Sequence, residues 1–146
     1  KTKADAKIPG KRVFTAATSA RMRQLMRMIV VDGTGSQADA LGYRVGGKTG
    51  STEKPGVGGY SRNLVVSTFA AAFPMDNPRY VVLAMLDEPQ GTEASSFQRT
   101  AGYTAAPVVR KTITRIGPLM GIIPDMKRDV DVSELMPLLW KAKGEQ

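Results

Sequence analysis

The chain has 146 residues, of which 42% are apolar and 23% charged, a composition typical of a folded domain rather than of a disordered segment. It has no cysteine and no histidine, which excludes disulfides, Cys/His zinc sites and a Ser-His-Asp triad supplied by this chain. We expect no cofactor and no metal ion. No run of about 18 apolar residues is present, so the sequence predicts no membrane-spanning helix within it.

The formal net charge of +8 is concentrated at the N-terminal end. Residues 1–28 hold eight basic side chains and one acidic one, whereas the other 118 residues hold 13 basic and 12 acidic ones. A basic end can bind nucleic acid or an anionic membrane surface, but no aromatic side chains that could stack on single strands alternate with these charges. We interpret the charge as a solvated flank and one polar helix face, with no nucleic-acid partner. The chain begins at Lys1 without a methionine, which indicates a segment of a larger protein.

The first expected element is a helix that follows an extended segment, residues 1–14. Thr15 or Thr18 is suited to cap this helix, which runs to about Val31, and the glycines of Asp32-Gly33-Thr34-Gly35 end it. Helical spacing predicts a core-facing apolar stripe made of Met22, Leu25, Met26 and Ile29.

Strands are expected next, at Tyr43 to Thr52, Leu64 to Phe73 and Arg79 to Asp87. Between the first two, Glu53 to Asn63 is rich in glycine and proline and predicts a flexible hairpin loop. Because neither connection has room for a crossover helix, we expect an antiparallel meander. The mostly apolar strands predict a sheet covered on both faces.

The C-terminal part is expected to hold one more helix. Gln90 to Ala105 is polar and predicts a loop, and Pro107 suits the first turn of a helix ending at Gly117-Pro118. Its inward stripe is Val109, Ile113 and Ile116.

The predicted fold class is α/β of the α+β type, an antiparallel sheet flanked by helices. It occupies residues 1–125, and residues 126–146 form a C-terminal tail. That tail is either a short docking helix or, as we favour, a loosely packed terminus. The tail is charged at first and then turns apolar at Leu135, Leu138, Leu139 and Trp140.

The segment from Gly42 to Thr49 matches the phosphate-loop pattern letter for letter, and Val81 to Glu88 is similar to its apolar-strand-plus-Asp partner. That pattern holds phosphate only when a strand precedes the loop and a helix follows the Lys-Thr pair. Gly50 and Pro55 follow instead, and no helix is expected there. A nucleotide-binding or basic nucleic-acid-binding domain remains the alternative function.

The residues Lys48-Thr49-Gly50-Ser51-Thr52 also match the Lys-Thr-Gly strand of serine acyl-transferases. In such a strand the lysine places positive charge beside the nucleophile, and the glycine lets a peptide lie flat. The next backbone N–H can point at a developing oxyanion. The competing interpretation is a lysine in an ordinary glycine-rich strand.

Those enzymes also need a Ser-x-x-Lys nucleophile and a Ser-x-Asn motif, and both strings occur, as Ser51 to Lys54 and Ser61 to Asn63. Ser-x-x-Lys works only when one helical turn stacks the lysine over the serine, whereas Ser51 is expected on a strand. We interpret both strings as coincidences and expect the nucleophile outside this chain.

From Val13 to about Asp125 the sequence resembles class B penicillin-binding proteins, especially the FtsI-like cell-division transpeptidases. The resemblance is carried, in order, by Val31–Gly35, Gly42–Ser51, Gly59-Tyr60, Ala71–Pro74, Asp76–Arg79, Val81–Pro89, Ala105–Val108 and Gly121–Asp125. It implies an incomplete β-lactamase/transpeptidase-like fold with the last three strands and two main helices. The first two strands, the helical subdomain and the nucleophile would lie upstream.

The resemblance also implies roles for the strand. Lys48 and Ser51 would be catalytic, the lysine orienting the upstream serine pair and the Ser51 N–H forming half of the oxyanion hole. Thr49 and the Ser51 hydroxyl would bind the carboxylate of the acyl donor, Gly50 would give the substrate room, and Thr52 would rim the cleft.

For the whole protein, the resemblance implies a serine-type D,D-transpeptidase that cross-links peptidoglycan stem peptides through an acyl-enzyme and is trapped by β-lactams. It would act in cell-wall synthesis and cell division at the periplasmic face of the inner membrane, held by an N-terminal anchor outside this chain. The expected partners are the upstream half of the domain and divisome membrane proteins. The fragment alone would be inactive, and its open sheet edge would favour self-association.

Overall fold

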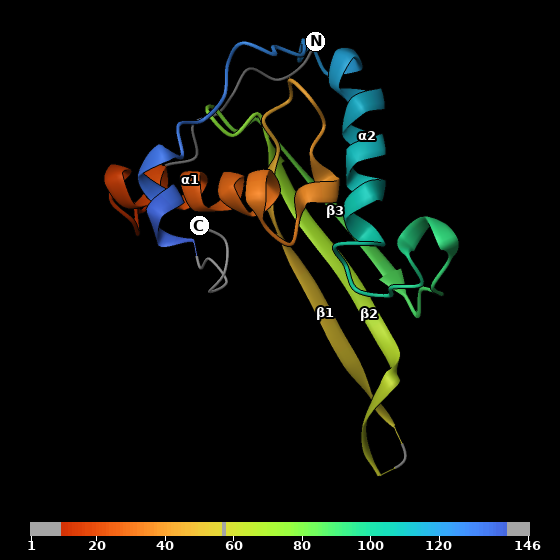
Figure 1. Ribbon diagram of the computed structural model, residues 1–146. Helices are drawn as coiled ribbons and strands as arrows, with labels where there is room; N and C mark the ends of the chain where they lie inside the picture. Colours follow the sequence, from red (N-terminus) through yellow and green to blue (C-terminus); the bar gives the residue numbers. More distant parts are fainter. Residues whose placement is uncertain (1–9, 57, 140–146) are drawn as a thin grey trace.

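The computed structural model describes residues 10–56 and 58–139. Two α-helices, three strands and three short 3-10 helices make up this part of the chain (Figure 1). In chain order they are α1 (Ala16–Asp32), η1 (Ser36–Ala38), β1 (Gly46–Gly56), β2 (Gly59–Phe73), β3 (Tyr80–Asp87), η2 (Glu93–Ser95), α2 (Ala105–Leu119) and η3 (Ser133–Leu138). This mixed α/β arrangement confirms the predicted fold class.

The strands form one antiparallel sheet in the order β1-β2-β3, which confirms the predicted meander. The predicted hairpin loop is wrong, because β1 and β2 continue through most of it and pair Lys54 with Ser61 and Gly56 with Gly59. The register of the pairing shifts between Glu53 and Lys54, where the glycine- and proline-rich segment begins. Pro55 is tolerated because β1 is an edge strand. The hairpin therefore extends well beyond the helices (Figure 1).

Helix α1 begins as predicted, with Thr15 as its N-cap, since the Thr15 hydroxyl accepts a hydrogen bond from the Thr18 backbone N–H at 3.0 Å. The predicted core stripe is wrong: Met22 is 47% exposed and Leu25 41% exposed. The buried side chains of the helix are instead Arg27, Met28 and Val30. All three lie in the last two turns of α1, whereas the N-terminal part of the predicted stripe is exposed.

The sheet has one covered face and one open face. On the covered face, α2 packs Val109 and Ile113 against Phe69 and Phe73 of β2, all fully buried, which confirms the predicted α2 stripe. On the open face, three β3 side chains are 65–78% exposed: Val81, Leu83 and Met85. The prediction that both faces are covered is therefore wrong for the β3 part of this face. Among the described residues, a helix approaches this face only at the start of β1, since a Cβ at Gly46 would lie 3.0 Å from the backbone nitrogen of Arg27 in α1.

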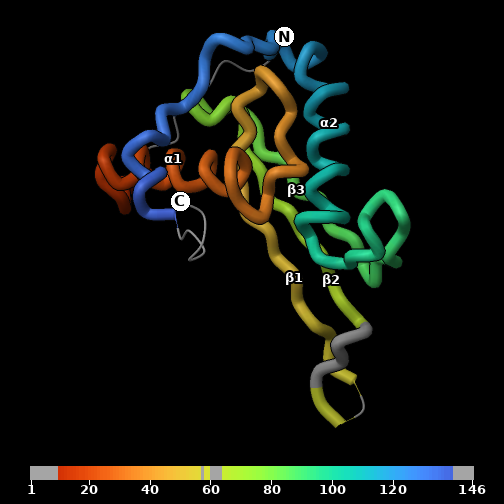
Figure 2. The backbone as a smooth tube through the Cα atoms, in the orientation of Figure 1, coloured from red at the N-terminus to blue at the C-terminus, as the bar shows by residue number. Residues whose placement is uncertain are grey.

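The segment after α2 returns to pack on α1, as the tube in Figure 2 shows. Leu135, in η3, is buried, Arg21 pairs with Glu134, and the Gln24 side chain donates to the Asp131 carbonyl at 3.0 Å. The described part of the tail thus fits the docking alternative rather than a loosely packed terminus. Trp140 lies outside the described residues.

Among residues 10–56 and 58–139, no helix combines the length and the apolar character that crossing a membrane requires.

Candidate active site

Lys48 lies on β1 near its start, opposite Ala70 of β2, which is in turn opposite Leu83 of β3. Directly opposed residues share a face, so Lys48 belongs to the open face and is exposed. Its ammonium group donates to the Thr49 carbonyl at 3.0 Å and to the Thr49 hydroxyl at 3.1 Å. Because β1 has a strand neighbour on one side only, this charge lies beside an unpaired strand edge.

Thr49 and Ser51 belong to the opposite, covered face, because side chains alternate along a strand. Thr49 is opposite Phe69, and its hydroxyl lies 3.1 Å from the hydroxyl of Thr34. The Ser51 hydroxyl accepts a hydrogen bond from the backbone N–H of Ala101 at 3.1 Å. Each hydroxyl is therefore held by a loop outside the sheet.

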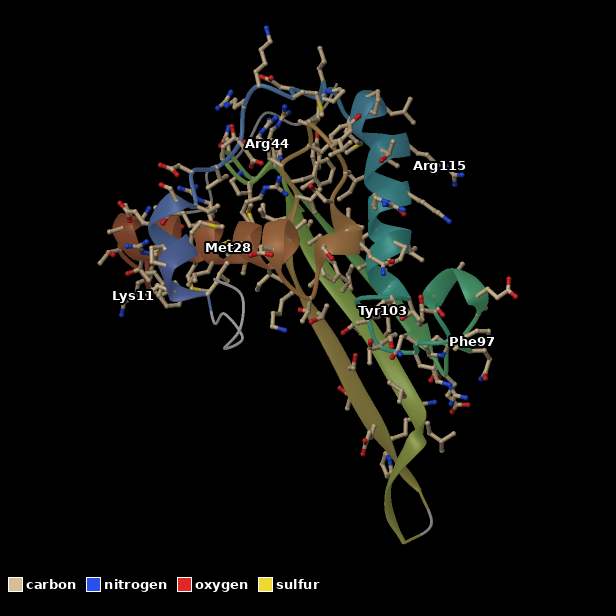
Figure 3. The ribbon with its side chains drawn as sticks, in the orientation of Figure 1. Lys11, Met28, Arg44, Phe97, Tyr103 and Arg115 are labelled. Carbon is tan, nitrogen blue, oxygen red and sulfur yellow. The ribbon has the colours of Figure 1, made fainter. Side chains whose placement is uncertain are left out.

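Both side chains line a pocket of about 360 Å³. Its other walls are the turn between α1 and η1 and the loop before α2, where Tyr103 lies beside the sheet (Figure 3). The lining residues are Gly33, Thr34, Ser36, Gln37, Thr49, Ser51, Thr100, Ala101, Gly102 and Tyr103. No charged side chain is among them, so the pocket offers hydroxyl groups and backbone amides to a ligand.

The backbone thus directs the predicted site side chains to two faces of the sheet, although the Lys48 ammonium group bonds to the Thr49 hydroxyl. Thr49 and Ser51 enter the pocket, while Lys48 and the exposed Thr52 do not line it. Sequence reasoning missed the two loops that complete the pocket. The signal for them was their composition: Gly33-Thr34-Gly35 and Thr100-Ala101-Gly102 both combine small residues with a hydroxyl.

Packing between β1 and β2 explains the glycine at position 50, which the sequence did not suggest. A Cβ at this position would lie 2.5 Å from the Thr68 hydroxyl oxygen, and that hydroxyl donates to the Gly50 carbonyl at 3.2 Å. The glycine thus makes room for a neighbouring strand's side chain. Whether it also makes room for a substrate stays a prediction.

The competing motifs do not have the geometry that their chemistry requires. Lys48 and Thr49 lie inside β1, with no helix after them, so the phosphate-loop arrangement is absent from this described segment. Ser51 and Lys54 are on the same extended strand rather than one helical turn apart. Lys54 pairs instead with Asp87 and Glu88, and the hydrogen bonds to these two carboxylates raise the pKa of its ammonium group.

A buried arginine fixes the chain where β1 begins. The Arg27 side chain, on α1, donates to both carboxylate oxygens of Asp129, to Asp39 at 2.9 Å and to the Val45 carbonyl at 2.9 Å. Val45 directly precedes β1. The described tail is thereby joined to α1 and to the strand that carries Lys48.

A second arginine, Arg44, donates to Asp76 at 2.7 Å and to the Gly42 carbonyl at 2.8 Å. Arg128 of the tail also pairs with Asp76, and Figure 3 shows Arg44 at the end of the sheet away from the hairpin. Burial opposes ionisation of Asp76, but the hydrogen bond and charge of Arg44, with the charge of Arg128, outweigh it and hold the pKa of this carboxyl below its ordinary value.

Within the described residues, no group of three His, Cys, Asp or Glu side chains is arranged to hold a metal ion.

Comparison with known sequences gives the region a family context. Residues 1–114 match the family described as the penicillin binding protein transpeptidase domain. The chain is 45% identical over 122 residues to the probable peptidoglycan D,D-transpeptidase FtsI of Caulobacter vibrioides (strain NA1000 / CB15N), spanning 77% of this chain and 21% of that protein. It is 36% identical over 117 residues to stage V sporulation protein D of Bacillus subtilis (strain 168), spanning 80% and 17%. The chain therefore covers about a fifth of the length of these relatives.

Solved structures agree with the sequence match. The transpeptidase domain of Burkholderia pseudomallei penicillin-binding protein 3 superposes with a TM-score of 0.71 at 31% identity, over 85% of this chain and 37% of that one. Penicillin-binding protein 3 of Mycobacterium tuberculosis, solved in complex with ampicillin, gives 0.66 at 29% identity, over 83% and 28%. By sequence and by structure, this chain belongs to the penicillin-binding protein transpeptidase family, in its FtsI-like branch.

Proposed function

We propose that this chain is the Lys-Thr-Gly part of a serine-type peptidoglycan D,D-transpeptidase that acts in cell-wall synthesis and cell division. The observation that supports it best is Lys48 beside the unpaired edge of β1, with Thr49 and Ser51 turned into a hydroxyl-lined pocket on the other face. An extended donor peptide can lie along such an edge, while its terminal carboxylate enters the pocket.

The chemistry would be acyl transfer through a serine ester. A serine outside this chain attacks the donor peptide carbonyl, the C–N bond breaks, and the amine leaves with a proton. An acceptor amine then attacks the ester, which restores the serine and forms the cross-link. Lys48 supplies positive charge toward that serine, and the Ser51 N–H stabilises the oxyanion of each addition step. Thr49 and the Ser51 hydroxyl bind the carboxylate, and Thr52 rims the cleft.

The open face indicates where the rest of the domain belongs. It presents three exposed apolar side chains and Lys48 in adjoining rows, and the outer edge of β3 has no strand partner in this sheet. We infer that the upstream part of the same domain, which includes the nucleophile, covers this face. In the isolated chain the same edge and face favour self-association.

The relatives extend the proposal to ligands and location. Since a relative of this fold has been solved with ampicillin, β-lactams are expected to acylate the complete protein at the same serine. From the FtsI-like relationship we also propose action at the periplasmic face of the inner membrane, an anchor outside this chain and contacts with divisome proteins. Nucleotide or nucleic-acid binding is not favoured, because Lys48 and Thr49 lie inside a strand.

Labelling with a fluorescent penicillin tests this function. The full-length protein should be labelled covalently at a serine upstream of this chain, and the chain alone should not be labelled. A Lys48→Ala variant of the full-length protein should lose about 100-fold or more in labelling rate, in line with the loss of a transition-state contact. Labelling of Ser51 in the isolated chain, or unchanged labelling of the Lys48 variant, would contradict the proposal.

A further inference from the structure

Thr34 links the turn between α1 and η1 to the Lys-Thr-Gly strand, and the sequence assigned it no role in the site. Its Oγ1 lies 3.1 Å from Oγ1 of Thr49, and both residues line the same pocket. Thr34 is exposed, so this contact is not a by-product of burial in the core.

The backbone of the turn is held in place independently of that contact. Gly35 donates its N–H to the Ile29 carbonyl at 3.0 Å, which anchors the turn to the end of α1. On the other side, the loop before α2 approaches so closely that a Cβ at Gly102 would lie 2.5 Å from the Thr34 carbonyl oxygen. The Thr34 hydroxyl is therefore presented to Thr49 from a fixed position.

Either hydroxyl can be the donor in this contact, and the choice decides where the Thr49 proton points. A lysine ammonium group can only donate, and a threonine hydroxyl has one proton and two lone pairs. Lys48 already donates to Thr49 Oγ1 at 3.1 Å. If Thr34 donates to the second lone pair, the single Thr49 proton is left for a ligand in the pocket. Without Thr34, that proton has no fixed direction.

We propose that Thr34 is a positioning residue that aims the Thr49 hydroxyl proton at the carboxylate of the acyl donor. The inference rests on the proposed function, because it assigns the carboxylate to this pocket. It predicts that Thr34 affects recognition of a carboxylate and leaves the acylation step itself unchanged.

The test compares Thr34→Val and Thr34→Ser in the complete transpeptidase domain, with a fluorescent penicillin and with its methyl ester, which lacks the free carboxylate. Valine keeps the shape and removes the hydroxyl, so the second-order labelling rate for the acid should fall roughly tenfold, the effect of one hydrogen bond to a charged ligand. The loss should lie in initial binding, with the acylation rate constant unchanged. The ester rate should stay within about twofold of wild type, and serine should restore the acid rate.

Thr114→Val is the matched control, since Thr114 is exposed on α2 and bonds to the Arg110 carbonyl of its own helix. It should behave as wild type. Equal losses for acid and ester in Thr34→Val would show a general structural role and overturn the inference, as would an unchanged acid rate. If the wild-type domain itself is not labelled, the proposed function fails, and this inference fails with it.

Discussion

The two faces of the sheet differ in what this chain supplies for them. The covered face is complete: α2 and the turn after α1 bury Phe69 and Phe73 fully. The open face leaves Val81 78% exposed beside the row that holds Lys48. The covered face is packed within this chain and holds β1 in place. The open face presents the ammonium group of Lys48, and we expect the upstream part of the domain to cover it. The same substitution should therefore affect the stability of the isolated chain much more on the covered face than on the open face.

The largest effect is expected on the covered face. Phe69→Ala removes a fully buried ring, and this should lower the free energy of unfolding by about 3–5 kcal/mol. The ring also lies directly under Gly47, whose added Cβ would be 2.7 Å from it, so the strand bearing Lys48 should loosen. Urea denaturation followed by circular dichroism measures the first effect. A loss below about 1 kcal/mol would show that the core collapses around the gap.

The next effect is expected where the tail joins α1. Asp129→Ala leaves the buried Arg27 with Asp39 and the Val45 carbonyl only, and should cost about 1–2 kcal/mol of stability. The control is Asp131→Ala, because the exposed Asp131 carboxylate accepts only from the nearby Ser133, through its N–H and its hydroxyl, among the described contacts. Equal effects in the two denaturation curves would show that the tail does not hold α1.

A smaller, pH-dependent effect is expected for Asp76→Asn. Because the folded-state pKa of Asp76 lies below its ordinary value of 3.8, its contribution is fully present above that pH and is lost as the pH falls through the folded-state value. The stability difference between wild type and variant should be constant near neutral pH and should shrink below about pH 4. Denaturation midpoints across that range measure it, and a difference that grows on acidification would contradict the assignment.

The smallest effect in the isolated chain is expected for Leu83→Lys on the open face. Leu83 is 65% exposed, so the free energy of unfolding should change by less than about 0.5 kcal/mol, and self-association seen by sedimentation should weaken. In the complete domain the same change buries a charge and should destabilise it by several kcal/mol, on the order of a large core defect. The matched control is Val82→Lys, whose side chain packs against the core and should destabilise both forms.

The sequence by itself determined the order of the elements, the antiparallel meander, the Thr15 cap and the α2 stripe. These depend on local signals: capping hydroxyls, helical spacing and connections too short for a crossover. It also placed Lys48, Thr49 and Ser51 on one strand, and the family match supports that placement.

Only the tertiary structure decided which face each site residue occupies, and which loops meet Thr49 and Ser51. Pairing of β1 with β2 made a strand of a glycine-rich segment that was expected to be a loop. On α1 the charged Arg27 is buried in place of the expected apolar stripe, because Asp39, Asp129 and the Val45 carbonyl accept its hydrogen bonds. Contacts between residues far apart in the chain have no local signature. For that reason Thr34, 15 residues from Thr49 in sequence and 3.1 Å away in space, became visible only in the fold.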